Sequence, residues 1–391
     1  MSTYARKDIA FTKGEGVWLW DHNGEKYLDA LSGIAVCGLG HAHPKVAKVI
    51  SDQAHALLHT SNIYRIDTQE KLGDRLCSIA NMDRVFFANS GAEANEAAIK
   101  LARLHGHAKQ IDTPTIVVCE NSFHGRTMAT LTATGNRKAH AGFEPLVAGF
   151  IRAPYDDVET IAQICINNSN VVAVFVEPIQ GEGGINLPAN NYLNQLRDIC
   201  NQHDLLLMLD EVQTGNGRTG EWFAYQHSNI LPDVVTTAKG LGNGIPIGAC
   251  LAKGPAAELF APGSHGSTFG GNPVACATAL QVLTTLEEDN LLKNAKEIGA
   301  EIIAGLQSAL GNHSLVSEIR GKGLMIGIEL SEPCSEIVNI ALSKNLLLNV
   351  TANNVIRILP PLITNSNEAS IIVSTIHDCI NDFQKTLNQT K

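Results

Sequence analysis

The sequence predicts an α/β fold: a large domain with a mostly parallel central sheet, and a smaller α+β domain formed by both ends of the chain. In the middle of the chain, short apolar runs alternate with segments of helical period, an alternation typical of parallel sheets. The two flanks lack it. We therefore place the large domain at residues 51–285, and the two parts of the smaller domain at 1–50 and 286–391.

Five short runs in the middle region are predicted to be buried strands, because each is apolar or β-branched and ends at polar residues. They are Arg84–Phe87, Thr115–Cys119, Val171–Val176, Leu205–Leu209 and Val234–Thr237. Between some of these runs, Glu93–His105 and Tyr192–Gln202 carry apolar residues at helical spacing.

The flanks predict different elements. Residues 14–36 form an expected hairpin region with a turn at Asp21–Gly24. Near the other end we expect an amphipathic helix over Leu291–Leu310, a glycine-rich strand around Gly321–Leu330 and a final helix after Asn367.

Composition excludes several classes of function. The 391 residues include 39 Asp and Glu against 29 Lys and Arg, a formal net charge of -10, so the chain has no cation excess for nucleic acid or an anionic membrane surface. No apolar run approaches the roughly 20 residues of a membrane span, and the N-terminus lacks the apolar core of a signal peptide. Nine cysteines without a CxxC pair fit reduced thiols. We expect a cytoplasmic protein.

A carboxylate follows one predicted strand. Asp210 comes directly after Leu205–Leu209, at the carboxyl end where open α/β sheets bind ligands. A loop start or a helix cap would explain Asp210 equally well. The next segment, Thr214–Gly220, is expected to be a flexible polar loop.

A lysine follows another predicted strand. Lys239 comes after Val234–Thr237, among small residues that allow another molecule to approach the backbone closely. A partly buried lysine near a cation can lose its proton and attack a carbonyl group. An ordinary solvated lysine is the alternative.

The segment Asn89–Asn95 joins a predicted strand to a predicted helix, and the free N–H groups of that helix start would bind an anion such as phosphate. A capping box between Ser90 and Glu93 is a compatible explanation. Carboxylate, lysine and helix start together match the ring nitrogen, aldehyde and phosphate of pyridoxal 5′-phosphate.

Several segments form a specific set of motifs: Gly38–Pro44, Ser90–Glu96, Phe123–Thr127, Glu177–Gly184, Asp210–Gly215, Thr237–Gly240 and His265–Pro273. With these motifs the chain resembles, over nearly its whole length, the class III aminotransferases of PLP fold type I, and within that family the acetylornithine branch.

The resemblance implies that Lys239 binds pyridoxal 5′-phosphate covalently and that Asp210 pairs with its ring nitrogen. It also implies a homodimer with shared active sites. The other cofactor-binding residues it implies are Ser90, Gly91 and Ala92 near the phosphate, Phe123 and Val212 on the two ring faces, Gln213 near the ring hydroxyl, and Thr268 from a neighbouring subunit.

For the substrates, the resemblance implies that Arg126 holds the distant carboxylate of an amine donor, a task suited to a planar cation. Arg357 would bind glutamate once Glu182 releases it, and Ser267 would also contact substrate. The implied reaction moves the terminal amino group of N2-acetyl-L-ornithine to 2-oxoglutarate, within arginine biosynthesis.

Alternatives stay open from the sequence. The segments Phe123–Arg126 and Ile34–Cys37 favour the acetylornithine branch, whereas Arg357–Pro361 departs from the version common in the family. Succinylornithine, N-succinyl-diaminopimelate, ornithine and 4-aminobutyrate aminotransferases are neighbours in the family. An aminomutase, which is an isomerase, shares the lysine and aspartate, and a cofactor-free binding protein would be expected to lack them.

His41 and His43 are interpreted as loop residues, and no metal is expected.

Overall fold

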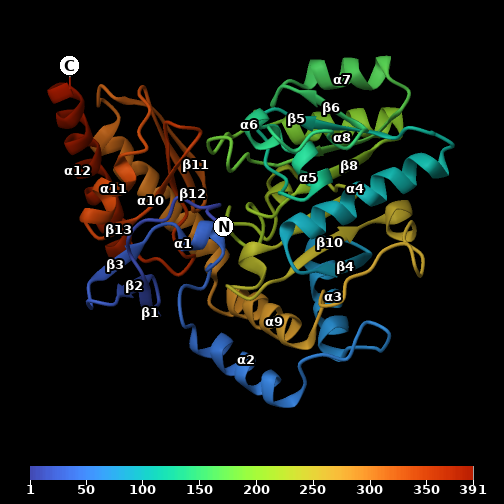
Figure 1. Cartoon of the computed structure of the whole chain (residues 1–391), viewed down its shortest axis with the longest axis horizontal. Helices are drawn as coiled ribbons and strands as arrows, with labels where there is room; N and C mark the ends of the chain where they lie inside the picture. Colours follow the sequence, from blue (N-terminus) through green and yellow to red (C-terminus); the bar gives the residue numbers. More distant parts are fainter. Residues whose placement is uncertain (391) are drawn as a thin grey trace.

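The computed structural model describes residues 1–390 and contains a seven-stranded sheet in the lobe on the right of Figure 1. The strand order is β4-β10-β9-β8-β7-β5-β6. Only β10 runs antiparallel to its neighbours, which confirms the mostly parallel sheet. The strands are β4 (Arg84–Ala88), β5 (Thr115–Cys119), β6 (Phe150–Ala153), β7 (Val171–Val176), β8 (Leu206–Asp210), β9 (Val234–Thr237) and β10 (Gly248–Ala252).

Helices cover both faces of this sheet, which explains why its central strands are apolar throughout rather than alternating. All six residues of β7 are buried. The helix α4 (Gly91–Ala108) packs on one face, against Val172 and Met208 among others. The helices α3 (Asp67–Ala80), α8 (Tyr192–His203) and α9 (Pro273–Glu288) join the core of the opposite face with Val174 and Leu207.

The two ends of the chain meet in a second lobe, on the left of Figure 1. Its first sheet has the order β1-β2-β3-β13, in which β13 of the C-terminal part pairs in parallel with β3 of the N-terminal part. Its second sheet has the order β11-β12-β15-β14. The strands are β1 (Phe11–Glu15), β2 (Trp18–Asp21), β3 (Lys26–Asp29), β11 (Val316–Lys322), β12 (Met325–Leu330), β13 (Leu346–Leu347), β14 (Asn349–Thr351) and β15 (Val355–Ile358).

The two domain boundaries, after residues 50 and 285, stay predictions, and Lys391 of the last segment lies outside the described residues. No helix within residues 1–390 is long and apolar enough to cross a membrane. The remaining helices are α1 (Ser32–Ala35), α2 (Pro44–Ala56), α5 (Met128–Ala133), α6 (Arg137–His140), α7 (Val158–Asn167), α10 (Leu291–Leu310), α11 (Ile337–Ser343) and α12 (Ser366–Thr390), with short 3-10 turns η1 (Ala224–Ser228), η2 (Lys239–Leu241) and η3 (Gly254–Glu258).

Three local expectations differ from the structure. The strand predicted to end at Leu209 ends at Asp210, so that this carboxylate belongs to the sheet rather than to a loop. The expected glycine-rich strand is a hairpin of β11 and β12, because Gly323 at φ +57° allows a turn. The segment 214–220, predicted to be a flexible polar loop, is buried: Arg218 Nη1 donates to the carbonyls of Leu324 at 3.1 Å and Pro360 at 2.5 Å.

Candidate active site

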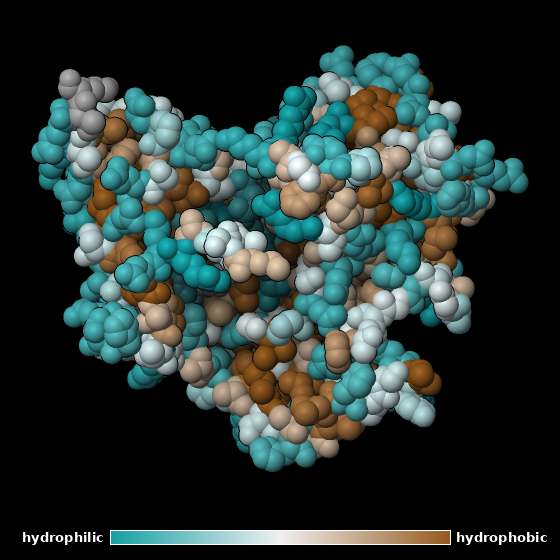
Figure 2. Space-filling view, viewed as in Figure 1, coloured by the Kyte–Doolittle hydropathy of each residue, from teal (hydrophilic) through white to brown (hydrophobic). Residues whose placement is uncertain are grey.

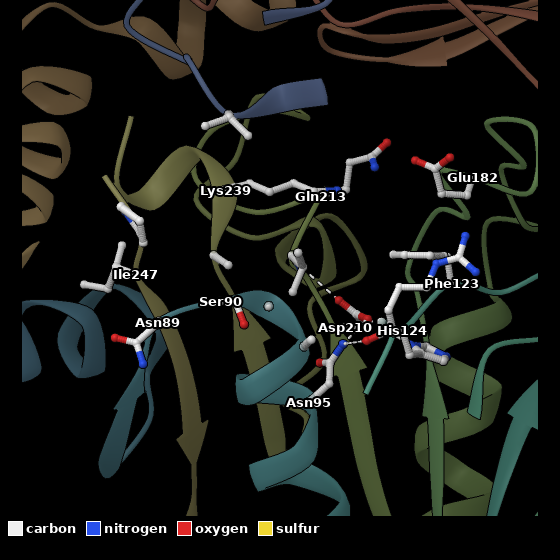
Figure 3. A pocket seen from close by; sticks show the side chains of 18 of the residues that line it. Asn89, Ser90, Asn95, Phe123, His124, Glu182, Asp210, Gln213, Lys239 and Ile247 are labelled. Carbon is white, nitrogen blue, oxygen red and sulfur yellow. Dashed lines mark hydrogen bonds and ion pairs between the residues drawn. The ribbon is translucent and has the colours of Figure 1, made fainter. Parts of the chain in front are cut away.

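A cavity of about 380 Å³ lies at the carboxyl ends of β7, β8 and β9 and beside the start of α4. The sequence places Asp210, Lys239 and Gly91 far apart, yet all three line this cavity. Parallel strands bring their carboxyl ends to one edge of a sheet, where loops from different strands meet. Figure 3 shows Asp210, His124 and Asn95 together on one side, while Lys239 extends toward Gln213 on the other. In Figure 2 the visible face is hollowed between the two lobes.

Asp210 is fixed by three hydrogen bonds. Its Oδ2 accepts from Asn95 Nδ2 at 2.8 Å and pairs with His124 Nδ1 at 2.8 Å. Its Oδ1 accepts from the backbone N–H of Val212 at 3.0 Å. A buried carboxylate with such partners keeps one orientation. Sequence reasoning missed Asn95 and His124, although both lie inside the quoted motifs.

Lys239 follows β9 and begins η2 at φ +43°, an uncommon conformation for a residue with a side chain. Burial lowers the pKa of its amine; Arg357 lowers it further, while Glu182 opposes the shift. Its ammonium forms no hydrogen bond or ion pair within residues 1–390. A lowered pKa leaves more of the amine neutral, which is the form that attacks a carbonyl.

The start of α4 has the features of an anion site. Ser90 Oγ accepts from the N–H of Glu93 at 3.2 Å, as the capping box predicts, but Glu93 Oε2 accepts from the N–H of Asn89 at 2.6 Å instead of that of Ser90. The N–H groups of Gly91 and Ala92, in the first helical turn, have no partner inside the helix. A Cβ on Gly91 would lie 2.7 Å from Val212 Cγ1, so only glycine fits there.

The expected ring contacts, Phe123 and Val212, both line the cavity. The guanidinium of Arg126 lies 5.3 Å from the centre of the Phe123 ring. Arg126 is exposed at the cavity and has no hydrogen bond or ion pair in the described part of the chain, so its planar fork is free for a carboxylate.

Glu182 and Arg357 form an ion pair at this cavity, with Arg357 Nη1 2.6 Å from Glu182 Oε1. Arg357 Nε also donates to Asn349 Oδ1 at 3.1 Å, while its buried Nη2 has no partner. Gln213 Oε1 lies 3.4 Å from Arg357 Nη1, so Gln213 contacts this pair as well as the cavity. Burial alone would raise the pKa of Glu182, but Arg357, Lys239 and Gln213 together outweigh burial and the net pKa is lowered.

Two predicted residues lie outside this cavity in the single chain. Ser267 and Thr268 line a neighbouring cavity together with Glu93 and Phe269. Ser267 Oγ accepts from Asn89 Nδ2 at 3.3 Å, and Thr268 is exposed. Their contribution to a site across a subunit boundary stays a prediction.

His41 has a structural contact rather than a place at the cavity. His41 Nε2 lies 2.8 Å from Asp29 Oδ2, and this pairing raises the pKa of His41 to about 9. Over residues 1–390 no group of three His, Cys, Asp or Glu side chains is arranged to hold a metal ion.

These residues fit pyridoxal 5′-phosphate. One cavity brings together an oriented buried carboxylate for a ring nitrogen, a lysine of lowered pKa for an aldehyde, and unpaired first-turn N–H groups for a phosphate. Their assignment as the cofactor's ligands remains a proposal drawn from this arrangement.

Comparison with known proteins agrees with this fit. Residues 2–380 match the family described as aminotransferase class III. The chain is 57% identical over 383 residues to the acetylornithine aminotransferase of Nitrosomonas europaea, covering 98% of both chains. It is 50% identical over 380 residues to acetylornithine aminotransferase 1 of Bordetella bronchiseptica, covering 97% of both.

Solved structures show the same fold. An ornithine aminotransferase from Toxoplasma gondii superposes with a TM-score of 0.95 at 33% identity, covering 99% of this chain and 93% of that one. An acetylornithine aminotransferase from Elizabethkingia anophelis superposes with a TM-score of 0.87 at 33% identity, covering 98% of this chain and 96% of that one.

Proposed function

The chain belongs to the class III aminotransferases, which use pyridoxal 5′-phosphate, and on that premise we propose that it acts on N2-acetyl-L-ornithine. The terminal amino group would pass to 2-oxoglutarate, giving N-acetyl-L-glutamate 5-semialdehyde and L-glutamate in arginine biosynthesis. The observation that carries this proposal is the 57% identity, over nearly the full length of both chains, to a protein named acetylornithine aminotransferase.

When bound, pyridoxal 5′-phosphate supplies an aldehyde for the amino group and a ring that withdraws electrons from the carbon losing its proton. Asp210, oriented by Asn95 and His124, would keep a proton on the ring nitrogen. Lys239 would accept and return a proton at Nζ, a role that its lowered pKa favours. The first turn of α4 would hold the phosphate.

Arg126 would select the amine donor. Its free guanidinium at the cavity can hold the α-carboxylate of acetylornithine while the terminal amine reaches Lys239. Acylation removes the positive charge that the α-ammonium of free ornithine would bring beside Arg126. Like-charge repulsion therefore favours the acylated donor.

Arg357 would bind the second substrate. With Glu182 paired to it, the guanidinium is neutralised and an uncharged part of the donor fits beside the pair. When Glu182 moves away, Arg357 offers a fork for the carboxylate of glutamate or 2-oxoglutarate. One cavity can thus accept two differently shaped substrates in turn, as a ping-pong reaction requires.

A homodimer with composite sites is part of the proposal. Large apolar side chains are exposed at Leu58, Ile63 and Tyr64, and also at Phe269, which directly follows Thr268. Asn62 Nδ2 donates to the carbonyls of Ser267 and Gly270, both at 3.0 Å, so these two segments form one surface. An exposed apolar surface of this kind is typical of subunit interfaces.

We also infer a cytosolic location. All nine cysteines are free, and seven of them are buried among apolar residues. Unpaired thiols are typical of a reducing compartment.

The deciding experiment is an amine-donor screen with 2-oxoglutarate, following glutamate formation. We expect the highest kcat/KM for N-acetylornithine, above succinylornithine, N-succinyl-diaminopimelate, ornithine and 4-aminobutyrate. Ornithine is the second candidate, because an ornithine aminotransferase superposes with a TM-score of 0.95. If ornithine has the highest kcat/KM, that candidate replaces acetylornithine, whereas absence of glutamate with every donor would contradict both.

A further inference from the structure

Glu177 is a buried carboxylate that the reaction proposed above leaves without a role. It follows β7 directly and lines the cavity, with 6% of its surface exposed. Its two oxygens bind two different loops. Glu177 Oε2 accepts from the N–H of Phe123 at 3.0 Å, and Oε1 accepts from the N–H of Gly181 at 3.2 Å.

Each of these loops carries a group that takes part in substrate recognition in the proposed reaction: Arg126 would bind a substrate carboxylate, and Glu182 would cover or release Arg357. Phe123 begins the segment that leads to Arg126, whose guanidinium lies 5.3 Å from the Phe123 ring. Gly181 immediately precedes Glu182, which is paired with Arg357 at 2.6 Å. A single carboxylate therefore ties the donor-binding loop to the loop that controls the second substrate.

We propose that Glu177 is a positioning residue whose carboxylate fixes the distance between Arg126 and the Glu182–Arg357 pair. The inference rests on the proposed function, because it assumes that Arg126 and the Glu182–Arg357 pair recognise the two substrates. Each substrate is held by a carboxylate and must present its reacting group at Lys239: the terminal amine of acetylornithine, far from its carboxylate, or the carbonyl carbon next to a carboxylate of 2-oxoglutarate. Loops that drift apart would misplace both substrates.

The surroundings of Glu177 give this role a pH dependence. Burial raises the pKa of Glu177 to about 7; nearby His124 opposes the rise and Asp210 adds to it. Lys239, Tyr155 and Cys119 also lie within electrostatic reach of Glu177. The ionised carboxylate can accept both backbone N–H groups strongly, whereas the protonated carboxyl keeps a strong acceptor on only one oxygen. Substrate binding should therefore weaken as the pH falls through 7.

Glu211 provides a matched control. It is also a buried glutamate next to a strand end, and burial raises its pKa to about 7 as well. Its Oε1 accepts from the backbone N–H of Tyr225 at 2.9 Å and its Oε2 accepts from Thr214 Oγ1. Glu211 does not line the cavity, and its side chain has no hydrogen bond to the Phe123–Arg126 loop or to the Gly181–Glu182 loop.

The test compares Glu177→Gln with Glu211→Gln in the cofactor-loaded enzyme. A glutamine at position 177 keeps one acceptor and turns an NH₂ group toward the other N–H. We expect Glu177→Gln to raise KM for both N-acetylornithine and 2-oxoglutarate about tenfold, with kcat within about threefold and the cofactor's visible absorption retained. The rise of KM below pH 7 should disappear in this variant. Glu211→Gln should keep wild-type KM values and their pH dependence.

A second variant keeps the proposal testable if Glu177→Gln does not fold. Glu177→Asp keeps the charge but is one methylene shorter, so it can reach only one loop; we expect KM to rise for one substrate more than for the other. Equal KM values in the wild type and both position-177 variants would overturn the proposal, as would an equal effect of Glu211→Gln. If the wild type prefers another donor, the proposed function fails, and the comparison with that donor still tests Glu177.

Discussion

Arg357 and Glu182 form an ion pair between the two lobes, with the guanidinium fully buried and the carboxylate one-third exposed. The two side chains therefore differ in their freedom to move. Arg357 is anchored in β15 and also bonded to Asn349 on β14, whereas Glu182 lies on a loop. The exposed carboxylate can therefore swing away while the guanidinium stays in place.

We predict that Glu182→Gln weakens discrimination between the two substrates. The neutral amide leaves Arg357 without its countercharge, so the guanidinium is available to α-carboxylates at all times. The ratio of kcat/KM for acetylornithine to that for glutamate should fall about tenfold. Single-turnover reactions of the loaded enzyme with each amino acid measure this ratio. An unchanged ratio would mean that the pair does not control substrate choice.

Lys239→Ala should abolish covalent attachment of the cofactor. In the wild type, borohydride reduction should fix a cofactor-sized mass on the peptide that contains Lys239, because an amine of lowered pKa reacts with aldehydes. The variant should show neither that mass nor the wild-type visible band. Lys253→Ala is the control, since Lys253 donates to Asn81 away from the cavity. Equal bands in the wild type and Lys239→Ala would disprove the assignment.

Asp210→Asn should reduce turnover far more than stability. The amide has a single oxygen, which can still accept from the Val212 N–H, while its NH₂ group takes the place of the oxygen that accepted from Asn95. A neutral amide cannot hold a proton on a ring nitrogen. We expect kcat to fall ~100-fold or more, which corresponds to several kcal/mol of barrier. Thermal unfolding followed in parallel should show a much smaller change. Near-normal turnover would place some other group at the ring nitrogen.

Arg126→Lys keeps the positive charge but loses the planar fork that matches a carboxylate. We expect KM for acetylornithine to rise strongly while KM for 2-oxoglutarate stays close to the wild-type value, because Arg357 would serve that substrate. Steady-state kinetics with each substrate varied separately give the two KM values independently. Equal rises for both substrates would contradict a donor-specific role.

A homodimer with shared sites should allow complementation. Lys239→Ala and a Thr268 variant should each be inactive, and mixing them with subunit exchange should restore part of the activity. Both defects then fall in one of the two sites, and the other site is intact. Sedimentation gives the mass in the same buffer. A fully active monomer would refute the proposal.

The local pattern of apolar and polar residues determined much of the fold. Val171–Val176 and Leu291–Leu310 begin and end in the structure at the residues that their apolar spacing predicted. Both are set by residues close in sequence, so a short window contains the necessary information. The motifs around Asp210 and Lys239 likewise predicted the cofactor chemistry, because the types and order of those residues are already specific.

Only the tertiary structure decided which side chains meet. Asn95 and His124 reach Asp210 from other segments, and Glu182 meets Arg357 across 175 positions of sequence. No periodicity encodes such contacts, since they depend on strand order and on where each loop turns. The same holds for Arg218, which lies in a segment predicted to be a flexible polar loop and is buried with backbone carbonyls of the other lobe as its partners. A buried polar group needs partners, and the fold alone determines which distant residues supply them.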